Sequence, residues 1–432
     1  MYQSRLPDDL PDGAGAVKGP LRQGLSRNVW MLGVTSLLTD ASSEMVSAVL
    51  PVYALYFLHL SPLSYGVIDG LQQGGASLVK LVAGWVTDRS GRHKAIAASG
   101  YAASTLSRLG LLFASANVML LTPIIALDRI GKGIRTAPRD AIISLSVGRD
   151  RLASAFGVHR ALDTCGALIG PILGFAILRW IRDGYDVVFV VSLALAAIAV
   201  AAIVTFVESP LDARTRKAAA DDVNRAPDGA PETLAPETLS PRFIRIAASA
   251  AILGAASVSD SFIYLSLQRK LGFDATLIPL LFIMTPAVYL TLAAPAGRLA
   301  DRVGRAWVIV LGYAMLLGVY VTLSSSLTGI PAAALVVGLL GTFYAATDGV
   351  FAAFAAGELP VARRATGLAI VSAGNDAGRM AASLAFGWFW TRGAPVTAVG
   401  QFQILLPVAI AIAVALLWPL LSGNHDSALP HG

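Results

Sequence analysis

The chain is poor in charged residues and contains a single cysteine. Only 14% of its 432 residues are charged, whereas 55% are hydrophobic and the mean hydropathy is +0.66. Soluble domains contain roughly 25% charged residues, so this composition excludes an ordinary soluble protein. Because Cys165 is the only cysteine, no disulfide can form within the chain.

Motifs for cofactors and catalysis are also missing. The sequence contains no phosphate-binding G-x-x-x-x-G-K-[ST] element and no dinucleotide-binding fingerprint in a strand–helix context. Its five histidines are scattered, and its methionines show no spacing suited to copper. We therefore expect no cofactor, no metal site, no enzymatic activity and no nucleic-acid partner.

Long apolar runs dominate the chain instead. A membrane-spanning helix needs about 20 mostly apolar residues, whereas the strands of a membrane barrel are about 10 residues long and alternate strictly. The runs are long and do not alternate, which predicts an all-α integral membrane protein with the lipid bilayer as its surroundings. We expect twelve transmembrane helices, at 29–58, 62–87, 93–115, 118–147, 151–179, 184–207, 242–268, 274–299, 305–326, 329–357, 361–390 and 398–421.

The chain is duplicated. A nine-residue pattern, G-x-x-x-D-R-x-G-R, begins at Gly84 and again at Gly297, 213 residues later. An offset of about half the chain length predicts two pseudo-symmetric six-helix bundles. The same offset relates Asp163 to Asp376 and places Arg135 opposite Asp348. The expected domains are a tail (1–27), a first bundle (28–207), a linker (208–241), a second bundle (242–421) and a second tail (422–432).

Positive charge predicts the orientation. Arginine and lysine are concentrated in the even-numbered connections, for example around Arg89, Arg151, Arg302 and Arg364. Because cytoplasmic loops carry this excess, we expect both termini and the linker to be cytoplasmic in a multi-pass protein of the cytoplasmic membrane. The linker contains Ala-Pro-Glu-Thr-Leu twice in succession, at 230–239, and is expected to act as a flexible tether.

These features resemble the major facilitator superfamily of secondary transporters. The resemblance extends over nearly the whole chain and includes two more motifs. Arg129-Ile-Gly-Lys-Gly133 is similar to the family's R-x-x-Q-G element, with Lys132 in place of glutamine. A G-x-x-x-G-P-x-x-G element follows at Gly166, Gly170, Pro171 and Gly174. Its glycines allow close helix approach and Pro171 is expected to bend helix five, and the resemblance associates the element with antiporters. Within the superfamily, the segments around Asp40 to Glu44, Lys80 and Asp128 to Asp140 resemble a prokaryotic branch with no assigned substrate.

The resemblance assigns conformational gating to the repeated pattern. Its aspartates can accept hydrogen bonds from a helix N-terminus, and pseudo-symmetry places Asp88 near Arg363 and Arg364, and Asp301 near Arg149 and Arg151. The alternative interpretation is that each copy is a turn whose charges only fix the membrane topology of the chain. The gating residues are predicted to be Gly84, Asp88, Arg89, Gly91, Arg92, Gly297, Asp301, Arg302, Gly304 and Arg305.

The fourth predicted helix carries an unusual stripe of cations. Arg129, Lys132, Arg135 and Arg139 are three, three and four residues apart, which places them on one face of a helix. At about 2.5–3.5 kcal/mol for each cation, exposing the four to lipid would cost on the order of 10 kcal/mol. The stripe must therefore face protein or water. A structural ion network is the alternative to a functional one for any single residue, although buried ion pairs stabilise poorly compared with apolar packing.

We predict a proton-coupled exporter of a small organic solute, anionic or zwitterionic, that works as a monomer by alternating access. Two alternatives remain: an uptake symporter for such a solute, and a membrane sensor that transports nothing. Export depends on the helix-five element alone. The predicted substrate and proton pathway consists of Asp40, Glu44, Arg129, Lys132, Arg135, Arg139, Arg160, Asp163, Asp260, Asp348 and Asp376.

Overall fold

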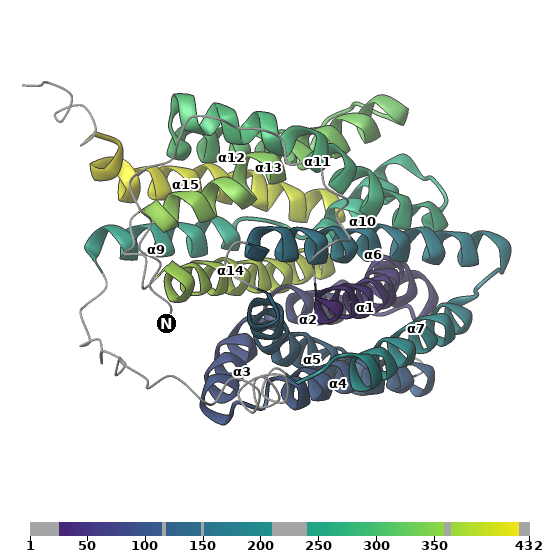
Figure 1. The fold of residues 1–432 in the computed structure, drawn as a ribbon. Coiled ribbons are helices and arrows are strands. Elements are labelled where there is room, and N and C mark those ends of the chain that lie inside the picture. The colour runs from purple at the N-terminus through teal and green to yellow at the C-terminus, as the bar shows by residue number, and fades with distance from the viewer. Residues whose placement is uncertain (1–25, 115–117, 148–150, 210–239, 358–363, 423–432) are drawn as a thin grey trace, which may run out of the picture.

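The computed structural model describes residues 26–114, 118–147, 151–209, 240–357 and 364–422, and all regular structure in these ranges is helical (Figure 1). The first half contains α1 (Arg27–Val52), η1 (Tyr53–Phe57), α2 (Pro62–Gly74), α3 (Ser77–Ser90), α4 (His93–Phe113), α5 (Val118–Leu145), α6 (Leu152–Trp180) and α7 (Tyr185–Phe206). The second half contains α9 (Pro241–Ala255), α10 (Asp260–Leu271), η3 (Ala275–Leu277), α11 (Ile278–Val303), α12 (Arg305–Ser324), α13 (Gly329–Gly357), α14 (Arg364–Arg392) and α15 (Pro395–Ser422).

These helices confirm the predicted all-helical membrane fold. Most predicted span edges agree with the helix bounds to within a few residues. Seven spans are long and apolar enough to be recognised by length and composition alone. The first four spans and the eleventh fall outside this group, and they contain most of the charged residues predicted to form the transport pathway.

The seventh span is broken, which corrects the continuous helix expected at 242–268. Residues 256–259 separate α9 from α10, and irregular backbone at membrane depth needs internal hydrogen bonds. Tyr320 on α12 supplies them: its hydroxyl accepts from the Val258 N–H at 2.8 Å and donates to the Ala256 carbonyl at 3.0 Å. Ser259 then caps α10, so Asp260 begins the new helix inside the protein.

The two halves contact each other mainly where α2 packs on α14 and α6 packs on α11. Glycine permits the first of these contacts. A Cβ atom on Gly66 would lie 2.7 Å from the Ser383 carbonyl oxygen, and one on Gly387 would lie 2.5 Å from the Pro62 carbonyl oxygen. Such distances exclude any side chain at either position without displacement of a helix backbone.

The helix bundle has two ends, the motif end and the distal end. The motif end is where α3 meets α4 at Gly91 and α11 meets α12 at Gly304. Both glycines have positive φ, 66° and 107°, as the tight turns predicted there require. The distal end is where α2 begins at Pro62 and α14 ends at Arg392.

Candidate functional site

A cavity of about 890 Å³ lies between the two halves. Its walls come from α3, α5 and α6 of the first half and from α9, α12, α13 and α14 of the second. The lining residues lie mostly in the parts of these helices nearer the motif end, for example Thr87 on α3 and Leu368 on α14. Its volume falls in the range of about 300–1,000 Å³ that is usual for sites of small organic ligands.

The cavity carries balanced charge. Among its lining residues, the charged side chains are three cations and three carboxylates: Lys80, Arg160, Arg379, Asp140, Asp348 and Asp376. Within the described ranges, Lys80 and Asp348 have no hydrogen bond or ion pair to another side chain. They lie on opposite halves, on α3 and α13, and are therefore the lining charges most available to a solute.

Arg379 organises the second half of the site. Its guanidinium donates to the Tyr344 hydroxyl at 3.1 Å and lies 3.9 Å from the Asp260 carboxylate. Tyr344 in turn donates to Asp260 at 2.5 Å. Arg379 also reaches across to the first half, where it donates to Gln73 Oε1 at 3.1 Å. One arginine therefore connects the broken seventh span with α13, α14 and α2.

Asp376 also links the halves. Its carboxylate accepts a hydrogen bond from Ser77, at the start of α3. Because α14 and α3 belong to different halves, this bond must break or rearrange if the halves move relative to each other. Sequence analysis did not identify Ser77, Gln73 or Tyr344, because a neutral polar residue within a span gives no distinctive signal.

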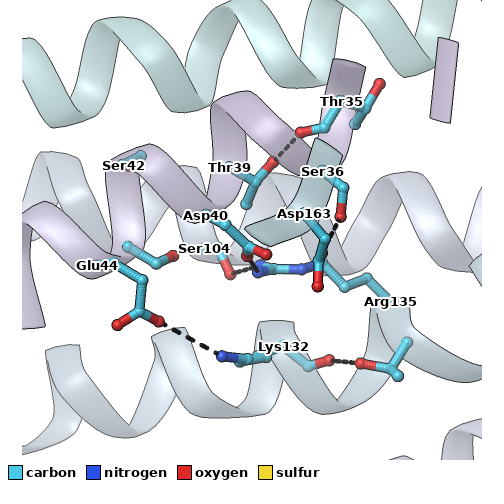
Figure 2. A network of polar contacts seen from close by, with 12 residues as sticks. Thr35, Ser36, Thr39, Asp40, Ser42, Glu44, Ser104, Lys132, Arg135 and Asp163 are labelled. Atoms are coloured by element: carbon cyan, nitrogen blue, oxygen red, sulfur yellow. Dashed lines mark hydrogen bonds and ion pairs between the residues drawn. The ribbon is translucent and has the colours of Figure 1, made fainter. Parts of the chain in front are cut away.

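The stripe of cations on α5 forms ion pairs with carboxylates of α1 and α6 and a hydrogen bond with α4, and Figure 2 shows two of its members, Lys132 and Arg135. Arg135 lies 3.5 Å from Asp40 and donates to the Ser104 hydroxyl at 2.9 Å. Lys132 lies 3.8 Å from Glu44, and these two side chains are about one third exposed. The expectation that the stripe faces protein or water is thus confirmed.

Arg139 and Asp163 carry this network toward the cavity. Arg139 lies 3.7 Å from the Asp163 carboxylate, which also accepts from the Ser36 hydroxyl at 2.7 Å. The other Asp163 oxygen lies 3.8 Å from Arg160, whose side chain is 79% exposed and lines the cavity. Asp163 therefore joins a buried cation of the stripe to a cation that a solute can reach.

The most deeply buried ion cluster lies at the start of the stripe. The Asp128 carboxylate accepts from Arg108 on α4 at 2.8 Å and from Arg129 at 2.7 Å. Arg108 is 1% exposed and also donates to Ser43 at 3.0 Å. All three charges belong to the first half and none lines the cavity, so they hold α1, α4 and α5 together.

The structure thus divides the predicted pathway. Of its eleven residues, Arg160, Asp348 and Asp376 line the cavity, and Asp260 adjoins it through Arg379. The other seven form ion pairs within the first half: Asp40, Glu44, Arg129, Lys132, Arg135, Arg139 and Asp163. In this conformation the four cations of the stripe form an internal ion network, which is the structural alternative to a transport pathway.

The glycines of the helix-five element serve close packing. Cβ atoms on Gly166 and Gly170 would lie 2.2 Å from the Leu37 carbonyl oxygen and 2.6 Å from the Ala41 carbonyl oxygen, both on α1. Gly174 continues the same contact against Val49, and Pro171 lies within an uninterrupted α6. The element therefore fixes α6 against α1, the helix that carries Asp40 and Glu44.

The predicted gating contacts fall largely outside the described residues. Arg149 and Arg363 lie there, and so do the side chains of Asp88 and Arg364. Asp301 lies 3.7 Å from Arg305 across the α11–α12 turn and is largely exposed. The gating role stays a prediction.

The distal end is closed where the halves meet. Tyr65 of α2 packs edge-on against Phe262 of α10, with ring centroids 5.2 Å apart, and Phe262 also contacts Phe386 and Trp390 of α14. The Leu63 N–H donates to the Thr391 hydroxyl at 3.0 Å, and the Tyr56 hydroxyl donates to Gln268. Apolar rings and hydrogen bonds between the halves therefore seal the cavity on this side.

The arrangement of two six-helix halves around a charged cavity is matched by comparison with known proteins. A family profile described as Major Facilitator Superfamily matches residues 32–283 and 246–430. The chain belongs to this superfamily. It is a multi-pass membrane protein of the transporter type, in a family whose members are transporters rather than enzymes.

Two relatives and three solved structures illustrate the range of the likeness. An uncharacterized MFS-type transporter of Methanocaldococcus jannaschii is 30% identical over 294 residues, 67% of this chain and 70% of the relative. An uncharacterized protein of Mycobacterium tuberculosis is 31% identical over 157 residues, 36% of this chain and 38% of that protein.

The solved structures share the fold at low identity. The nucleoside transporter NupG is 13% identical with a TM-score of 0.70, over 91% of this chain and 99% of its own. A POT family transporter in complex with 5-aminolevulinic acid is 13% identical with a TM-score of 0.70, over 92% and 97%. A bacterial homologue of the human lysosomal transporter Spinster, inward-facing and occupied, is 14% identical with a TM-score of 0.65, over 91% and 97%.

Proposed function

We propose that this protein is a proton-coupled secondary transporter that exports a small zwitterionic or anionic organic solute across the cytoplasmic membrane. The observation that carries the proposal is the balanced charge of the cavity, in which Lys80 and Asp348, on opposite halves, have no hydrogen bond or ion pair to a side chain among the described residues. A solute with one negative and one positive group contacts both halves at once. Its binding energy is then available to draw the halves together around it.

The predicted orientation of the bundle indicates which side of the membrane the cavity opens to. With the motif end on the cytoplasmic side, as the positive charges predict, the cavity opens to the cytoplasm and the closed distal end faces outward. The solute of an exporter enters from the cytoplasm, so this conformation is the loading state. The POT family transporter of similar fold, solved with 5-aminolevulinic acid, supports an amino-acid-like solute as the first class to test.

Asp163 is the proposed link between proton and solute. While ionised, it attracts Arg139 and Arg160. A zwitterion in the cavity can place its anionic group on Arg160 and its cationic group near the ionised Asp163. Protonation of Asp163 removes the negative charge that attracts the cationic group and so favours release of the solute. Proton and solute then bind in alternation, as export by exchange requires. Each tenfold preference of solute for the deprotonated form corresponds to about 1.4 kcal/mol of coupling.

A ligand screen followed by transport tests the proposal. Purified protein is heated with zwitterionic, anionic and cationic metabolites and antibiotics, and compounds that raise the unfolding temperature are assayed in liposomes with an imposed pH gradient. We expect zwitterions or anions to stabilise the protein and to move against a proton gradient. Arg160→Gln should weaken binding, whereas Asp163→Asn should bind solute as weakly as the unsubstituted protein does at low pH, without pH dependence.

Other outcomes identify the alternatives. Solute that accumulates in the direction of proton flow would establish uptake by symport. Stabilisation by cations alone would overturn the proposed solute class. Retention of pH-dependent binding and transport in Asp163→Asn would remove this residue from the coupling mechanism and direct attention to Asp40 and Glu44.

A further inference from the structure

Asp69 is a buried carboxylate in the contact between the two halves. It lies on α2, is 0% exposed, and accepts a hydrogen bond from Ser383 of α14 at 2.6 Å. Ser259 and Ser261, at the start of α10, lie beside the same carboxylate. Its second oxygen, Oδ1, has no hydrogen-bond partner among the described residues. The carboxylate therefore lies among neutral hydroxyl groups contributed by both halves.

No cation pairs with Asp69 within the described part of the chain. The elements packed on α2 bring few charged or titratable groups near it. Arg379 of α14 is bound to Tyr344, Asp260 and Gln73, and Arg129 of α5 is bound to Asp128. Tyr65 lies one turn earlier on α2, and its buried hydroxyl is also without a described partner. Other titratable groups on the elements packed against α2 include Lys132 on α5, Asp376 on α14, which is held by Ser77, and the tyrosines Tyr53 and Tyr56 on η1.

An ionised carboxylate is poorly accommodated in such a place. Removing a charge from water is costly unless a cation or several hydrogen bonds replace the lost solvation. Here Ser383 donates to one oxygen, Ser259 and Ser261 lie nearby, and no described donor lies within hydrogen-bond distance of Oδ1. A neutral carboxylic acid fits better, because no net charge is buried and its O–H can donate to a neighbouring serine hydroxyl.

The surroundings of Asp69 must change when the transporter reorients. It lies between Gly66 and Gly70 on the face of α2 that meets α14, where Gly66 approaches the Ser383 backbone. Alternating access requires the halves to separate at the end that is now closed. Separation of α2 from α14 there breaks the bond to Ser383 and admits water to the carboxylate.

We propose that Asp69 is a proton-binding site that holds the distal end closed. The closed end binds a proton at Asp69, and opening hydrates the carboxylate and releases the proton to the solution on the distal side. Low pH on that side then favours closure, and high pH favours opening. The inference requires only that the halves alternate, so it stands or falls independently of the solute and of Asp163.

Distance measurement between the halves tests the proposal directly. In a Cys165→Ser background, spin labels at Arg182→Cys and Ala394→Cys place one probe on each half in exposed distal loops. The double-labelled protein is reconstituted in lipid nanodiscs, and distance distributions are recorded from pH 5 to pH 9. We expect the ratio of open to closed molecules to rise with pH, by as much as tenfold per pH unit for one released proton.

Asp69→Asn replaces the carboxylic acid by a neutral group of the same shape. The distal end of this variant should remain closed from pH 5 to pH 9, to the extent seen in the unsubstituted protein at pH 5. The dependence of its open-to-closed ratio on pH should be lower by one proton. Asp69→Ser also lacks an ionisable group and provides a second variant if Asp69→Asn folds poorly. An unchanged slope in either folded variant, or an open distal end at pH 5, would overturn the proposal.

Two controls isolate the effect. Asp274→Asn removes an exposed distal carboxylate, and the Thr276 backbone N–H holds the pKa of Asp274 below its usual value, so it is ionised throughout the range. This variant should behave like the unsubstituted protein. Replacing sodium by N-methylglucamine at constant pH should leave the ratio of open to closed molecules unchanged. Closure that depends on sodium instead would show that the carboxylate and its serines bind a metal cation, and the proton site would be refuted.

Discussion

The two halves of this transporter hold their intramembrane charges in different ways. In the first half, cations and carboxylates form ion pairs with one another, and Asp128 with its two arginines is almost completely buried. In the second half, Arg379 pairs with Asp260 and lines the cavity together with Asp348 and Asp376. Each half thus contributes three charged side chains to the cavity, but the first half holds seven further members of the predicted pathway in internal ion pairs. In the second half, Asp260 is the only pathway member with an ion pair among the described residues.

The difference shows why sequence position alone cannot assign function to an intramembrane charge. The duplication places Asp163 and Asp376 at equivalent positions, yet Asp163 accepts from Ser36 of its own half and Asp376 accepts from Ser77 of the other. Equivalent residues thus acquire different roles from their neighbours. Substitutions in the two halves should therefore differ in size and in whether they affect stability or transport.

The largest loss of stability is expected for Asp128→Asn. This substitution leaves Arg108 and Arg129 buried without their shared counter-ion, and breaking a buried pair in this way costs about 3–5 kcal/mol. Thermal unfolding in detergent should occur at a much lower temperature. Replacing Arg108 by Gln should cost less, because Asp128 keeps Arg129. Equal stability of Asp128→Asn and the unsubstituted protein would show that the cluster is not a framework.

The next largest effect is expected for Arg379→Gln, and it should appear in transport. Without Arg379, Asp260 loses its cation and the halves lose the bond to Gln73. We expect transport in liposomes to fall by roughly 100-fold, the equivalent of about 2.7 kcal/mol. Arg182→Gln, an exposed arginine at the distal end, is the matched control. Full transport by Arg379→Gln would place the functional charges in the first half instead.

Solute binding should depend on Lys80 and Asp348 individually. A hydrogen bond to a charged group contributes about 1.5–3 kcal/mol, so Lys80→Gln and Asp348→Asn should each weaken binding about 10- to 100-fold. Because neither has a described ion-pair partner, their unfolding temperatures should change little. Calorimetry with a compound from the stabilisation screen measures both effects. A zwitterion should be affected by both substitutions, whereas an anion should respond to Lys80→Gln alone.

The smallest effect is expected for Lys132→Gln. Lys132 and Glu44 form the longest pair of the stripe, at 3.8 Å, and both side chains are partly exposed. Solvent-exposed pairs contribute about 0–1 kcal/mol, so stability should change by no more than that. A marked loss of transport with normal stability would identify Lys132 as a solute contact and restore the stripe to the transport pathway.

Much of the fold was predictable because hydrophobicity and repetition are local properties. Apolar runs of sufficient length define most spans, and the repeat of the Gly84 pattern at Gly297 predicts two equivalent halves. The break at residues 256–259 was not predictable, since it depends on the Tyr320 hydroxyl, 62 residues away from Val258. No local pattern reveals a partner at that separation.

The candidate site was predictable in its residue types and less so in its arrangement. The cost of placing charge in lipid follows from sequence, and it correctly required the cations of α5 to face protein or water. The cost of placing charge in lipid also singles out Asp69 in the second predicted span, although this residue was not among the predicted pathway residues. Its partner Ser383 is 314 residues distant and emerges only when α2 packs against α14.

The sequence by itself determined that the chain spans a membrane, that it is duplicated, and that its charges cannot face lipid. These conclusions follow from the composition, the internal repeat and the cost of placing charge in lipid, none of which depends on a tertiary contact. The tertiary structure decided which charges neutralise one another, which line the cavity, and which end is closed. Those outcomes depend on the packing of two halves whose interacting residues are about 300 positions apart in the sequence. Whether a charged side chain pairs internally or faces the cavity depends on how the helices of the two halves are placed.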